Sequence, residues 1–166
     1  ILDFKDIIKK INRKNEINFK TKKFSQNFID RFDLKFDLAY GNLNYLKKVS
    51  ISKNLSICEG NLNFLEEYPI LFFDCSLNFN NKKKLLKIFF IKSKNENQNY
   101  KLFVKGNLNI LNKKINFKNI STTNKYKASK EDLLYYKQTF ENIIFNKSFF
   151  EIFEYKKIRN FILEIS

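Results

Sequence analysis

The feature that most constrains the fold is a strict two-residue alternation of apolar and polar side chains in two separate segments. In the first, one parity is apolar and the other polar: Phe32, Leu34, Phe36, Leu38 and Tyr40 against Asp33, Lys35 and Asp37. In the second, which follows Pro69, the apolar set is Leu71, Phe73, Cys75, Leu77 and Phe79. Because successive side chains of a strand point to opposite faces, each segment predicts a β-strand with one apolar face.

Other segments continue this pattern without an intervening helix. Val49, Ile51, Leu55 and Ile57 share parity around Lys53 and Asn54, and shorter strand candidates cover 85–91, 102–104, 108–111 and 115–120, with a polar loop over 93–99. Consecutive strands without crossover helices pair as an antiparallel meander. Residues 16–121 are therefore expected to form one antiparallel sheet.

The chain has only three glycines, and all of them begin the tetrapeptide GNLN, at Gly41, Gly60 and Gly106. If Gly41 and Asn42 are the centre of a tight hairpin, Tyr40 pairs with Leu43 and the apolar parities match. Gly60 fits a hairpin in the same way, either beginning at Gly60 or centred on Glu59 and Gly60. The parity continues through Gly106, which suits an unbroken strand with a close backbone approach or a bend. The glycines are either ordinary turn and bulge residues or the mark of a recurring two-strand unit.

Both ends of the chain change to a helical period. Asp3, Phe4, Ile7, Ile8 and Ile11 predict a short amphipathic helix within 1–15. Ser129 and Asp132 resemble a capping box before an apolar stripe, which predicts a helix over 129–145. Ser148 begins a second short helical pattern. The segment 158–165 fits either a helix or a closing strand, and we expect a strand. Residues 125–166 are thus expected to be a helical cap with a final strand.

The formal net charge of +15 raises the question of a polyanionic partner. Only three of the 32 basic residues are arginine, however, and the excess of Lys, Asn, Ile and Phe is typical of an AT-rich genome. Arginine is the preferred residue for forked contacts with phosphates and bases. Its scarcity argues against a dedicated reader of nucleic acid.

The residue types that most enzymes recruit are missing from the sequence. The chain has no histidine, and its two cysteines have no metal-ligand or redox spacing, so we expect no metal site and no cofactor. The three glycines are too far apart for a phosphate-binding loop. Paired carboxylates such as Glu66 and Glu67 have sufficient structural explanations. These observations predict a protein that is not an enzyme.

Cys58 and Cys75 lie on neighbouring predicted strands. A short connection around 66–69 would bring them close to opposite one another, which allows either a cross-strand disulfide or two small apolar residues packed side by side.

The length of 166 residues predicts one domain, and the absence of methionine indicates a processed chain or a piece of a longer protein. The longest apolar runs, 70–73 and 88–91, are too short to cross a bilayer, so a membrane anchor is expected outside this segment.

Twenty Phe and eight Tyr supply a large aromatic surface. These side chains are core if the helices cover the sheet, and line a groove for acyl chains if the sheet is curved and partly uncovered. Periodicity alone leans toward a core.

The order of elements in residues 33–81 resembles the C-terminal region of AsmA-like proteins: an alternating strand, a short basic break, a second strand ending at Glu59 and Gly60, a strand at 62–65, and then a strand led by Pro69. Residues 105–121 resemble another strand pair of that type. The resemblance implies a long curved sheet with an apolar trough, anchored to the inner membrane of a diderm bacterium and extending into the periplasm, that moves phospholipids toward the outer membrane. The chain departs from the family in its few glycines, its lack of an anchor helix and its helical C-terminal third.

The resulting fold hypothesis is α+β: a curved antiparallel meander with a short N-terminal helix and C-terminal helices that cap one end. The functional hypothesis is a non-enzymatic segment that handles phospholipid for transport or outer-membrane biogenesis. Its expected lipid-binding residues are Phe36, Leu38, Tyr40, Leu71, Phe73, Leu77 and Phe79. The alternative is a basic subunit of a ribonucleoprotein or organellar assembly, in which scattered lysines bind nucleic acid.

Overall fold

The computed structural model describes residues 15–21, 29–51, 53–80, 83, 86–87, 90–91, 99–145 and 155–165. The predicted N-terminal helix within 1–15, the helical pattern that begins at Ser148, and most of the polar loop at 93–99 lie outside these residues.

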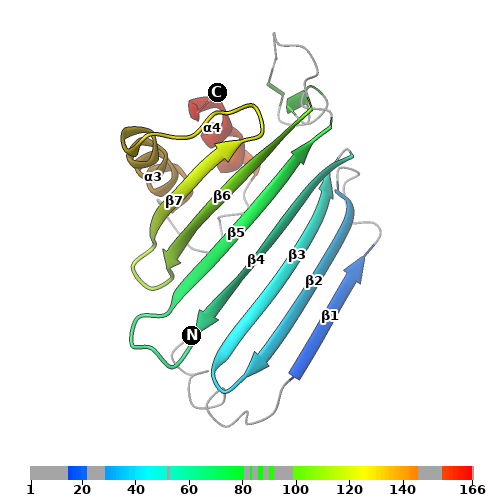
Figure 1. Cartoon of the computed structure of the whole chain (residues 1–166), viewed down its shortest axis with the longest axis vertical. Coiled ribbons are helices and arrows are strands. Elements are labelled where there is room, and N and C mark those ends of the chain that lie inside the picture. The colour runs from blue at the N-terminus through cyan, green and yellow to red at the C-terminus, as the bar shows by residue number, and fades with distance from the viewer. Residues whose placement is uncertain are drawn as a thin grey trace.

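The described strands form one open antiparallel sheet whose spatial order equals their order in the sequence (Figure 1). The strands are β1 (Asn15–Thr21), β2 (Ile29–Ala39), β3 (Asn42–Ile51), β4 (Asn54–Asn63), β5 (Ile70–Phe79), β6 (Tyr100–Asn109) and β7 (Lys114–Thr122). The predicted curved antiparallel meander is confirmed. Because strands that neighbour one another in the sheet are consecutive in the sequence, antiparallel pairing needs no crossover.

The hairpin between β2 and β3 has a different centre from the one predicted. Tyr40 and Gly41 both have positive φ, 48° and 77°, and are the central residues of the turn. Positive φ at both positions matches the right-handed twist of a two-residue hairpin. Leu43 therefore pairs with Leu38 rather than with Tyr40, and Phe36 pairs with Tyr45. The error of two residues preserves parity, so the same side chains share a face.

Two further strand predictions were wrong. The parity shared by Val49 and Ile57 belongs to two strands, because the chain reverses between Ile51 and Asn54, where Lys53 has a positive φ of 67°. In the candidate strand at 85–91, the described residues Leu86 and Lys87 are helical.

Gly60 does not form a hairpin, because it lies inside β4 directly opposite Phe73. For the same reason the separate strand expected at 62–65 was wrong, since β4 continues to Asn63 and residues 64–68 belong to the connection that follows it. The next strand places Gly106 opposite Phe73 on the other side. The predicted unbroken strand through Gly106 is confirmed, with a bulge in the pairing of β6 and β7 next to it. A Cβ at Gly106 would lie 2.7 Å from Phe73 Cζ, and one at Gly60 would lie 2.9 Å from Tyr45 Cε1. The glycines thus provide room for neighbouring aromatic rings.

Two described helices follow the sheet. Helix α3 (Lys130–Ile144) begins with a capping box in which the Ser129 side chain accepts from the Asp132 backbone N–H and the Asp132 side chain accepts from the Ser129 backbone N–H. The predicted helix and its cap are confirmed. Helix α4 (Tyr155–Ile165) occupies the segment for which we expected a closing strand, so that expectation was wrong. Phe161 packs edge-to-face on Phe140 of α3, and this contact favours the helical period.

The core lies between these helices and the β5–β7 end of the sheet. Its cluster comprises Leu108, Ile115, Ile144 and Phe145, with Leu71, Phe73, Phe117, Phe140, Ile143 and Phe161 packed against it. Rings contact in sequence from Phe73 to Phe117 and on to Phe140, with centroid separations of 6.3 and 6.0 Å. The C-terminal helices therefore cap one end of the sheet, as predicted.

Candidate functional site

The cross-strand register divides the side chains of the sheet into an apolar face and a polar face. Directly opposite residues share a face, so each set of paired residues forms a row across the strands. One row contains Phe36, Tyr45, Gly60, Phe73, Gly106 and Phe117, and the next contains Leu38, Leu43, Leu62, Leu71, Leu108 and Ile115. We call this side the apolar face.

Six of the seven expected lipid-binding residues belong to the apolar face, and the structure divides them into two groups. Leu71 and Phe73 pack against the core cluster beneath the helices. Phe36, Leu38, Leu77 and Phe79 are half-buried. The seventh, Tyr40, lies in the β2–β3 turn and is 64% exposed. Among the expected residues, Phe36 and Leu38 lie on β2, away from α3.

The β1–β3 end of the apolar face differs from the capped end, whereas Leu62 on β4 is buried. Helix α3 packs on β7 and on α4, and the core cluster reaches no farther than β5 among the described residues. On β2 and β3 the apolar residues are half-buried, with Phe32, Leu34, Phe36, Leu43, Tyr45 and Val49 in this class. At the edge strand, Ile17 is 60% exposed opposite Phe36. We call Ile17, Phe32, Leu34, Phe36, Leu43, Tyr45 and Val49 together the apolar shelf.

The apolar shelf contains one charged residue that the sequence analysis missed. Lys47 lies opposite Leu34 on β2 and Cys58 on β4, so its side chain belongs to the apolar face. It is half-buried, and burial lowers its pKa because water solvates the ammonium less well there. The signal was present in the sequence, since Lys47 shares parity with Tyr45 and Val49. It becomes visible only once β3 is known to run through all three residues.

Cys58 and Cys75 form a disulfide next to Lys47. The two residues are directly opposite on β4 and β5, with Cα atoms 4.1 Å apart. The alternative of two reduced cysteines packed side by side is thus replaced by a covalent link across the middle of the sheet.

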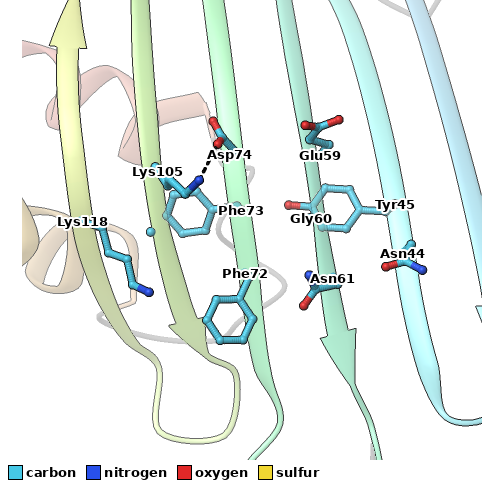
Figure 2. Close-up of a pocket in the computed structure, with 11 residues that line it drawn as sticks. Asn44, Tyr45, Glu59, Gly60, Asn61, Phe72, Phe73, Asp74, Lys105 and Lys118 are labelled. Atoms are coloured by element: carbon cyan, nitrogen blue, oxygen red, sulfur yellow. Dashed lines mark hydrogen bonds and ion pairs between the residues drawn. The ribbon is translucent and has the colours of Figure 1, made fainter.

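The polar face carries a shallow hollow of about 490 Å³ that crosses five strands, β3 to β7. Figure 2 shows Glu59, Asp74, Lys105 and Lys118 around it, with Phe72 between the strands' polar side chains. Lys105 Nζ donates to Asp74 Oδ2 at 3.0 Å, and Lys118 Nζ lies 5.5 Å from the centre of the Phe72 ring. The hollow contains charges of both signs, two acids on β4 and β5 and two lysines on β6 and β7, and these charged side chains are exposed. Such a surface is suited to solvent, so the apolar shelf is the stronger candidate.

No group of three or more potential metal ligands occurs within the described ranges. No helix among the residues that the structure describes is long and apolar enough to cross a membrane.

Comparison of the chain with protein families, curated proteins and solved structures found no match.

Proposed function

We propose that this chain is a non-enzymatic lipid-handling segment that holds phospholipid acyl chains against the apolar shelf. The observation that carries the proposal is the position of the capping helices: α3 and α4 pack at the β5–β7 end, whereas Phe36, Tyr45 and their neighbours at the other end keep part of their apolar surface accessible. Removing acyl chains from water supplies the affinity, at about 0.8 kcal/mol for each buried methylene before ordering costs.

The periplasm of a diderm bacterium is the compartment we propose, with the membrane anchor in a part of the protein outside this segment. The disulfide supports an oxidising compartment, since cytosolic thiols are kept reduced. The open curved meander also agrees with the sheet implied by the resemblance to AsmA-like proteins, whereas the C-terminal helices do not belong to that pattern.

The distribution of charge supports this proposal over a nucleic-acid partner. On the polar face, Asp33 pairs with Arg31 at 2.7 Å and Asp74 with Lys105 at 3.0 Å. Acids therefore interrupt the lysines of the described strands, whereas a nucleic-acid interface concentrates basic residues on one surface.

Native mass spectrometry of the purified chain tests the proposal. We expect co-purifying phospholipid in the unmodified chain and its loss in Phe36→Asp, because a carboxylate on the apolar shelf is costly to bury beside acyl chains. Phe103→Asp is the matched control, since Phe103 is on the polar face and 37% exposed. We expect this variant to keep both fold and lipid.

Two outcomes contradict the proposal. One is a Phe36→Asp variant that loses its circular-dichroism spectrum together with lipid, which would make Phe36 a core residue. The other is a chain that carries nucleic acid, released between low and moderate salt, and no lipid.

A further inference from the structure

Lys47 is the only charged residue on the apolar face among the described side chains of β2–β7. The register places it in a row with Leu34, Cys58, Cys75, Val104 and Ile120. The rows on either side contain no acid, so no carboxylate of these strands faces the ammonium. The Lys47 side chain also forms no hydrogen bond or ion pair with any described residue.

An unpaired, half-buried ammonium is costly to maintain unless an anion joins it. Lys47 is half-buried on β3, an interior strand flanked by β2 and β4, so the side chains nearest to it on the same face are those of these strands. The disulfide opposite Lys47 fixes the neighbouring strands and offers no charge to it. The site therefore provides a cation that has no carboxylate partner on these strands and is surrounded by apolar side chains.

We propose that Lys47 binds the phosphate of an anionic phospholipid whose two acyl chains lie on the apolar shelf on either side of it. This inference rests on the proposed function and names the lipid class. Charge complementarity selects the headgroup: one cation on the face matches one net negative charge, whereas a zwitterionic headgroup brings its own cation and gains less from Lys47.

The surroundings of Lys47 match an amphiphile with two tails. Along β3, Tyr45 lies on one side of Lys47 and Val49 on the other, and each is paired with an apolar residue of β2, Phe36 and Phe32 respectively. Apolar surface thus extends from the ammonium in both directions along the strands. A single-chain carboxylate would use only one of these two surfaces.

The test compares binding of phosphatidylglycerol, phosphatidylcholine and oleate, with the same acyl chains in both phospholipids, by native mass spectrometry of the purified chain. We expect phosphatidylglycerol to bind about ten-fold more tightly than phosphatidylcholine, which is about 1.4 kcal/mol. Lys47→Met should remove that preference and leave phosphatidylcholine binding unchanged, and Lys47→Arg should restore it. Lys48→Met is the matched control, because Lys48 is exposed on the polar face. This variant should keep the preference.

The possible results separate the two ideas. Equal binding of both phospholipids by the unmodified chain, or a preference that persists in Lys47→Met, overturns the role of Lys47 and leaves the lipid-handling function standing. Tighter binding of oleate than of phosphatidylglycerol overturns the phosphate assignment. Failure of all three ligands to bind overturns the proposed function itself.

Discussion

Phe73 on β5 lies directly opposite Gly60 on one side and Gly106 on the other, and its ring occupies the space that a Cβ at Gly106 would need. Two of the three glycines therefore serve the packing of aromatic rings across the sheet. Edge-to-face contact with Phe117 then continues this row to the helices.

Substitution of either interior glycine by alanine should destabilise the fold. A Cβ at Gly60 would collide with the backbone carbonyl oxygen of Phe72, and one at Gly106 with that of Asn116. Backbone atoms move less easily than side chains, so we expect a loss of about 1–3 kcal/mol in urea unfolding for each variant. Asn61→Ala, at an exposed position next to Gly60, is the control and should change stability by less than about 0.5 kcal/mol. Equal effects of Gly60→Ala and Asn61→Ala would contradict the steric argument.

Reduction of the disulfide should lower stability without changing the strand order. Cys58 and Cys75 are 17 residues apart, and closing a loop of about this length contributes roughly 3 kcal/mol in the chain-entropy treatment. The unfolding midpoint of the unmodified chain should fall when dithiothreitol is added. The double variant Cys58→Ala, Cys75→Ala should already have the lower midpoint and should not respond to the reductant. An unfolding midpoint that does not change with dithiothreitol in either protein would show that the disulfide does not contribute to stability.

Removal of the Lys47 charge should stabilise the chain when no lipid is present. Burial lowers the pKa of Lys47 from its ordinary value of 10.5, so between the lowered pKa and 10.5 the folded state binds fewer protons than the unfolded state. The free energy of unfolding contributed by Lys47 therefore rises with pH across that window, and the unfavourable contribution is fully present below it. We expect Lys47→Met to raise the unfolding midpoint at pH 7.

The pH dependence provides the control for this prediction. Tyr45 is the nearest titratable side chain on the apolar face along β3. Burial raises its pKa, so the stability that Tyr45 contributes is lost at high pH both in the unmodified chain and in Lys47→Met. The difference between the unmodified chain and Lys47→Met should shrink as pH rises toward 10.5. A difference that stays constant from pH 7 to 10 would exclude desolvation of Lys47 as its cause.

Glu141 of α3 should protect the outer edge of β7. Its Oε1 accepts the Ile115 backbone N–H at 3.0 Å, and its Oε2 pairs with Lys114 Nζ at 3.1 Å. An uncovered edge strand pairs with other chains. Glu141→Ala should therefore increase self-association in sedimentation velocity, whereas Gln138→Ala, at an exposed position of α3, should not. Identical sedimentation of the two variants at high concentration would contradict this role.

The Ser129 side chain should contribute to the stability of α3. Ser129→Ala removes the acceptor for the Asp132 backbone N–H and should cost about 1 kcal/mol in urea unfolding. Ser129→Asp keeps an acceptor at that position and should recover most of the loss. A Ser129→Asp variant as unstable as Ser129→Ala would show that the cap is not what stabilises the helix.

Sequence patterns were sufficient to predict the strands with alternating side chains, their antiparallel order, the capped helix α3 and the face to which Phe36, Leu38, Leu71 and Phe73 belong. All of these follow from local periods and from the proximity of consecutive strands, which need no knowledge of distant contacts. The position of Cys75 opposite Cys58 also followed from the short connection between β4 and β5.

The remaining features depend on contacts between residues that are distant in the sequence. The centre of the Tyr40–Gly41 turn and the interior place of Gly60 depend on which residues pair across strands, because a shift of two residues leaves parity unchanged. The segment around Phe161 is helical because it packs on Phe140. These two residues are too far apart in the sequence for a local pattern of side chains to predict their contact. The place of Lys47 among apolar rows, and the division of those rows into a core under α3 and an apolar shelf, likewise arise from cross-strand pairing and helix packing.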